Sequence, residues 1–69
     1  MESFEIQLLE DRFLIEPQDN GLYRIMDGEN KIGTIFAEAD GDQVKWNTQD
    51  ELEDGFVQQI GELITEHNM

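Results

Sequence analysis

Hydrophobic and polar residues alternate along the first two thirds of the chain, a pattern typical of half-buried strands. Phe4, Ile6 and Leu8 alternate with polar residues, and further strands are expected over 12–16, 22–27, 31–38 and 43–47. Turn-forming residues separate these segments: Glu10-Asp11, then Gln18 to Gly21, then Asp27 to Asn30, then Asp40-Gly41. Because the connections are short, the pattern predicts a five-stranded antiparallel meander.

The last third of the chain predicts a helix. Its apolar residues recur at three- and four-residue steps, Leu52, Phe56, Ile60 and Leu63, and His67 follows at the next four-residue step. The segment from Thr48 to Glu51 fits a capping box, in which the two end residues satisfy each other's backbone amides. Gly61 lies on the apolar side, and a glycine there costs about 1 kcal/mol of helix propensity. We therefore expect the helix to approach the sheet closely at Gly61.

These elements predict one α+β domain over residues 1–69, with the meander in 1–47 and the helix in 48–67 packed on one sheet face. Two-residue hairpin loops would place one set of residues under the helix: Phe4, Ile6, Leu8, Phe13, Ile15, Leu22, Met26, Gly33, Ile35, Ala37, Val44 and Trp46. An odd loop in the second hairpin would instead move the first two strands to the other face, because the side-chain period of a strand is two.

Charge is the strongest compositional feature. The 69 residues carry 17 acidic and four basic side chains, a formal net charge of -13, and no cysteine. Such a charge repels nucleic acids and anionic lipid surfaces, so direct binding to either is not expected. The first five residues have neither the basic start nor the apolar segment expected of a signal peptide, and no apolar run approaches about 20 residues. We therefore expect a cytoplasmic protein of bacterial or phage origin.

Candidate catalytic and metal-binding residues are few. The only serine is Ser3, the only histidine is His67, and no phosphate-binding glycine loop occurs. The acidic stretches do not match an EF-hand loop, since Leu52 falls at a ligand position and Gly61 at the closing glutamate. With no cysteine, a zinc site is not expected either. The sequence thus predicts a protein that is not an enzyme and holds no cofactor or metal.

Two binding hypotheses remain. Apolar residues on the sheet face opposite the helix are a candidate partner site: Leu14, Tyr23, Ile25, Ile32 and Phe36. Unless the sheet curls to bury them, they predict docking of another protein or of a second copy of this chain. The alternative is a nucleic-acid mimic that occupies a basic protein through its carboxylates: Asp40, Asp42, Asp50, Glu51, Asp54, Glu62 and Glu66. Binding through carboxylates weakens with salt, whereas an apolar interface persists.

A further pattern spans most of the chain. It consists of Gly21-x-Tyr23-x-Ile25, Ile32-Gly33-x-Ile35, Trp46 and Ile60-Gly61-x-x-Ile64. In these residues the chain resembles small uncharacterised bacterial proteins built as a β-meander with a C-terminal helix. The resemblance implies the same fold and brings no activity or site residue with it.

Overall fold

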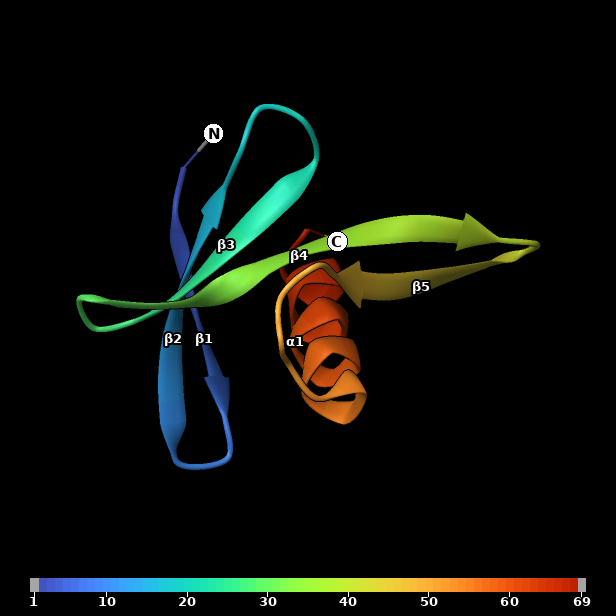
Figure 1. Cartoon of the computed structure of the whole chain (residues 1–69). Helices are drawn as coiled ribbons and strands as arrows, with labels where there is room; N and C mark the ends of the chain where they lie inside the picture. Colours follow the sequence, from blue (N-terminus) through green and yellow to red (C-terminus); the bar gives the residue numbers. More distant parts are fainter. Residues whose placement is uncertain (1, 69) are drawn as a thin grey trace.

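The computed structural model describes residues 2–68 and contains a five-stranded sheet followed by one helix (Figure 1). The elements are β1 (Phe4–Leu8), β2 (Asp11–Pro17), β3 (Leu22–Asp27), β4 (Asn30–Asp40), β5 (Gln43–Thr48) and α1 (Asp54–His67). The strands lie in the order β1-β2-β3-β4-β5, and every neighbouring pair is antiparallel. The predicted α+β meander with a C-terminal helix is confirmed.

The sheet curls around α1. The helix contacts β4 and also both edge strands, β1 and β5, which a flat five-stranded sheet would hold too far apart for one helix. The buried core lies between the two layers: Ile6, Phe13, Ile15, Ile25, Ile35, Trp46, Val57, Ile60 and Ile64. The distal part of the β4–β5 hairpin extends past the helix (Figure 1), and Ala37 and Val44 are exposed there although they lie on the helix side of the sheet.

Two hairpins keep the predicted faces with a different register. Ile6 pairs with Phe13 across β1 and β2, and Ala37 pairs with Trp46 across β4 and β5. Both registers differ by two residues from those expected for loops at Glu10-Asp11 and Asp40-Gly41. A shift of two residues leaves each side chain on its own face. The first loop is consequently Leu9-Glu10, in which Leu9 has a φ of 58°.

The faces predicted for β3 are wrong. Five residues separate the paired Pro17 and Tyr23, an odd number, and this reverses β3 relative to β2. A β-bulge between β3 and β4 then leaves Ile32 unpaired and reverses the faces again. The two changes cancel for β4 and β5, so only β3 is turned over. Tyr23 and Ile25 therefore face the helix in place of Leu22 and Met26.

The helix begins at Asp54, not after Thr48. Thr48 still belongs to β5, where its hydroxyl donates to the Thr34 carbonyl oxygen at 2.7 Å and accepts from the Asp50 amide at 3.0 Å. The Asp50 carboxylate accepts from the Thr34 amide at 2.8 Å. The Thr48 hydroxyl, which a capping box would direct to the Glu51 amide, is bonded elsewhere, so the predicted box does not form. Glu53 is the N-cap residue, and its side chain makes no capping bond.

The close approach at Gly61 is confirmed. Gly61 is buried against the indole ring of Trp46, and a Cβ atom added at this position would overlap that ring. On the same helix, the Gln58 side-chain amide accepts from the Trp46 amide at 3.3 Å and donates to the Trp46 carbonyl oxygen. Trp46 is thus fixed by α1 through both its ring and its backbone.

Candidate functional site: the outer face of the sheet

The sheet face turned away from α1, called here the outer face, is the candidate site. Register and side-chain alternation place sixteen residues on it: Glu5, Gln7, Arg12, Leu14, Glu16, Leu22, Arg24, Met26, Lys31, Thr34, Phe36, Glu38, Asp40, Gln43, Lys45 and Asn47. Within the part of the chain that the structure describes, no other element packs over this face, since the single helix lies on the opposite side.

Apolar side chains on the outer face form two cross-strand pairs. Leu14 lies opposite Met26, and Leu22 lies opposite Phe36. All four are half-buried by their neighbours in the curled sheet. They remain accessible on the side where a partner would approach, because that side is covered only by adjacent side chains. The two pairs therefore form apolar patches that no element within residues 2–68 covers, on a face that is otherwise polar and charged.

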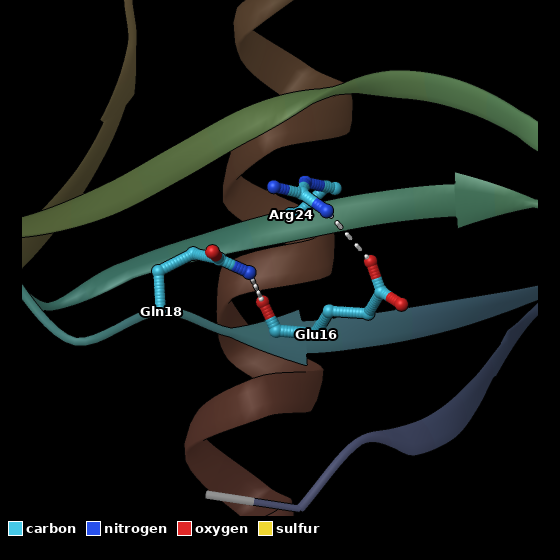
Figure 2. A network of polar contacts seen from close by, with 3 residues as sticks. All are labelled: Glu16, Gln18 and Arg24. Carbon is cyan, nitrogen blue, oxygen red and sulfur yellow. Dashed lines mark hydrogen bonds and ion pairs between the residues drawn. The ribbon is translucent and has the colours of Figure 1, made fainter.

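A polar row separates the two apolar pairs. Arg24 lies opposite Glu16 on β2 and Thr34 on β4. Its guanidinium donates to the Glu16 carboxylate at 3.3 Å, and the Gln18 amide donates to the Glu16 carbonyl oxygen at 2.8 Å (Figure 2). Figure 2 shows this ion pair in front of the sheet with α1 behind it. With side chains 43% and 31% exposed, the pair orients the two groups more than it stabilises the fold.

Charges are distributed unevenly between the outer face and the rest of the molecule. All four basic side chains of the chain lie on this face: Arg12, Arg24, Lys31 and Lys45. Four carboxylates accompany them: Glu5, Glu16, Glu38 and Asp40. The outer face is thus formally neutral, and the entire side-chain charge of -13 lies on the remaining surface.

A hollow opens at the margin of the outer face, where β5 ends and the chain turns toward the helix. It is lined by Leu22, Lys31, Thr34, Phe36, Gln49 and Asp50. The bonds from Thr34 to Thr48 and Asp50 fix the rim of this hollow. Its lining combines an apolar pair, one cation and one carboxylate, which suits an amphipathic protein side chain.

The predicted partner residues do not all lie on this face. Leu14 and Phe36 do, as expected. Ile25 is fully buried in the core, Tyr23 packs edge-on against Trp46 with ring centroids 5.7 Å apart, and Ile32 packs against the core from the bulge. The predicted position on the uncovered face is therefore wrong for these three residues: the reversal of β3 moves Tyr23 and Ile25, and the bulge in β4 moves Ile32. Leu22 and Met26, which sequence reasoning placed under the helix, take their places on the outer face.

The predicted acidic residues are exposed and lie in three separate parts of the structure. Asp40 and Asp42 are at the end of the β4–β5 hairpin, Asp50 and Glu51 are in the loop before α1, and Asp54, Glu62 and Glu66 are on the helix. The Asp50 carboxylate is already bonded to the Thr34 amide, and the Asp54 carboxylate accepts from Gln58 at 3.3 Å. The structure thus distributes these seven residues over three segments, and two of their carboxylates already accept hydrogen bonds within the chain.

Two exposed apolar residues were missed as candidates. Leu9, at the first hairpin, is 85% exposed and has positive φ, a conformation that leucine rarely adopts. Val44 on β5 is 62% exposed. The sequence offered one indication that Leu9 is exposed: it is an apolar residue directly before the predicted turn at Glu10-Asp11. Neither residue lies on the outer face.

No group of three or more acidic, histidine or cysteine side chains in residues 2–68 is arranged to hold a metal ion. The imidazole of His67 stacks on the ring of Phe4, with centroids 3.8 Å apart and the planes 8° from parallel. His67 therefore joins the end of α1 to the start of β1.

Comparison with known proteins finds no family model, no curated protein and no solved structure that matches this chain. The resemblance to bacterial β-meander proteins therefore stays a prediction. Across residues 2–68, the helix is too short and too polar to cross a membrane.

Proposed function

We propose that this chain is a non-enzymatic protein-binding module whose docking surface is the outer face of the sheet. The observation that carries this proposal is the coincidence of two properties on one surface. The face bears the apolar pairs Leu14–Met26 and Leu22–Phe36, and it is the part of the molecule where acidic side chains are balanced by basic ones.

Protein interfaces combine an apolar centre with a polar and charged rim. The outer face has apolar and charged parts of this kind: its two apolar pairs lie on β2, β3 and β4 on either side of the Glu16–Arg24 ion pair, while Glu5 on β1 and Lys45 on β5 lie toward the two edges. Phe36 also lines the hollow, so its aromatic ring lies at a concave part of the surface. Aromatic residues in such positions are frequent energetic centres of interfaces.

The test is a capture experiment with matched variants. Wild-type protein, Phe36→Glu and Val44→Glu are immobilised, exposed to host lysate at low salt, and washed with increasing salt before mass spectrometry. Both variants add one carboxylate, but only Phe36 is on the outer face. We expect a protein that is retained through high salt by the wild type and by Val44→Glu, and that is lost with Phe36→Glu.

Two outcomes would contradict the proposal. One is equal retention by all three proteins, which would place the binding surface elsewhere. The other is a nucleic-acid-binding protein that elutes at moderate salt from all three, because long-range electrostatic attraction is screened at a Debye length of about 8 Å near 0.15 M salt. That second result would favour nucleic-acid mimicry through the acidic surface.

A further inference from the structure

We infer that the partner docked on the outer face is a second copy of this chain, so that two sheets pack face to face in a symmetric dimer. This inference rests on the proposed function, since it uses the same surface. It adds the identity of the partner, which we argue from the distribution of charge over the surface.

Electrostatic repulsion opposes contact between two copies through most of their surface. Outside the outer face, the surface carries thirteen carboxylates and no basic side chain other than His67. Contact through the helix would bring Glu62 and Glu66 of both copies together. Contact through the outer faces puts the acidic helices on the two far sides of the assembly, where their mutual repulsion is smallest.

The outer face is also complementary to itself in charge. Glu16 pairs with Arg24, and Glu38 lies opposite Lys45, so these four groups are matched within one copy. Two cations and two carboxylates remain, because Arg12 lies opposite Gln7, Lys31 opposite Met26, Glu5 opposite Leu14, and Asp40 opposite Gln43. A twofold interface requires that each surface match its own copy, and because the unmatched cations and carboxylates are equal in number, each cation of one copy has a carboxylate on the other with which to pair.

Pairing of the two copies through the β5 edge is obstructed. At the middle of β5, the backbone amide and carbonyl of Trp46 are both bonded to the Gln58 side chain. An incoming strand would have to displace this side chain before it could bond to Trp46. The face, and not this edge, is therefore the surface on which a second sheet can dock, at the sheet-to-sheet spacing of about 10 Å.

Sedimentation tests the dimer directly. Wild type, Phe36→Glu and Val44→Glu are compared from about 10 μM to about 1 mM protein, the range of moderate and weak affinities. The comparison is made at about 0.05 M and about 0.5 M NaCl, which changes the screening length several-fold. We expect a wild-type dimer whose dissociation constant falls as salt screens the repulsion between the copies, and a similar dimer for Val44→Glu. For Phe36→Glu we expect a dissociation constant more than about tenfold higher than that of the wild type.

A second measurement does not depend on Phe36→Glu remaining folded. Because the chain has no cysteine, Thr34→Cys and Glu62→Cys each carry one spin label, on the outer face and on α1 respectively. A dimer through the outer faces predicts a shorter label-to-label distance at position 34 than at position 62. The reverse order would overturn the inference.

The inference also fails if the wild type remains monomeric under all these conditions. In that case, Phe36-dependent capture of another protein would leave the proposed function standing with a different occupant. Loss of both the dimer and the Phe36-dependent capture would remove the proposed function as well.

Discussion

Trp46 and Gly61 form the closest contact between the helix and the sheet. The indole ring occupies the space in which any other residue at position 61 would place its Cβ atom. Ile60 and Ile64 on either side are fully buried. The glycine costs about 1 kcal/mol of helix stability relative to alanine. In return, it lets the helix backbone contact the ring. Because Gly55 faces open space in the same helix, the two glycines allow these effects to be separated.

We expect Gly61→Ala to lower the free energy of unfolding by about 1–3 kcal/mol, since the added methyl group forces the helix away from Trp46. The matched variant Gly55→Ala should raise it by up to about 1 kcal/mol through helix propensity alone. Urea unfolding followed by Trp46 fluorescence measures both changes. A stabilised Gly61→Ala would mean that the helix is not in contact with the indole.

At the level of whole elements, side chains complete hydrogen bonds that strands leave open. The Gln58 amide bonds both backbone groups of Trp46 on the free side of β5. Thr48 and Asp50 do the same for the carbonyl and amide of Thr34, next to the point where β5 ends. Unpaired edge groups are templates for uncontrolled strand addition, and bonded side chains remove that possibility locally.

Gln58→Ala should lower the free energy of unfolding by about 1 kcal/mol, the usual contribution of a hydrogen bond whose partner remains half-accessible to water. It should also increase aggregation during thermal unfolding, because the centre of β5 becomes available for pairing. Gln59→Ala is the control, since Gln59 is exposed on the same helix. Thermal denaturation with light scattering checks both effects, and equal behaviour of the two variants would show that Gln58 does not protect the edge.

The sequence was sufficient to predict the elements but not the faces of β3. Alternation groups Ile6, Phe13 and Ile15 on one face of β1 and β2, and helical spacing groups Ile60 and Ile64 on one side of α1; the structure confirms both groupings. In β3, by contrast, Leu22 and Met26 alternate with Tyr23 and Ile25, so apolar residues occupy both faces and either orientation satisfies the pattern. The choice is made by the odd loop after Pro17 and the bulge at Ile32, and neither is visible in hydrophobic periodicity.

The same reversal of β3 explains why only some of the predicted partner-binding residues lie on the outer face. Leu14 and Phe36 were placed correctly because β2 and β4 kept their faces, whereas Ile25 moved into the core with β3. The helix start was misplaced because Thr48 has two possible roles. A threonine three residues before a glutamate suits a capping box, but the hydroxyl bonds instead to the Thr34 carbonyl of a neighbouring strand, a long-range contact that local sequence does not reveal.

On the scale of the whole molecule, the helix side and the outer face have opposite electrostatic roles. A large net charge of one sign opposes association, so we expect the acidic helix side to hold copies apart in solution. The outer face has no net charge, so contact through it does not meet this repulsion. The same excess charge also acts within one molecule, since carboxylates such as Glu62 and Glu66, four residues apart on α1, repel each other by a few tenths of a kcal/mol.

The monomer should therefore become more stable as salt is added, independently of any dimer. We expect the melting temperature to rise between about 0.02 M and about 0.3 M NaCl, a range over which the Debye length falls from tens of ångströms to a few. Measuring Phe36→Glu at low protein concentration removes the contribution of association. Glu62→Gln in that background should start from a higher melting temperature and respond less to salt, because one repelling charge on α1 is gone. A melting temperature that does not change with salt would mean that the excess carboxylates are too far apart in the folded state to destabilise it.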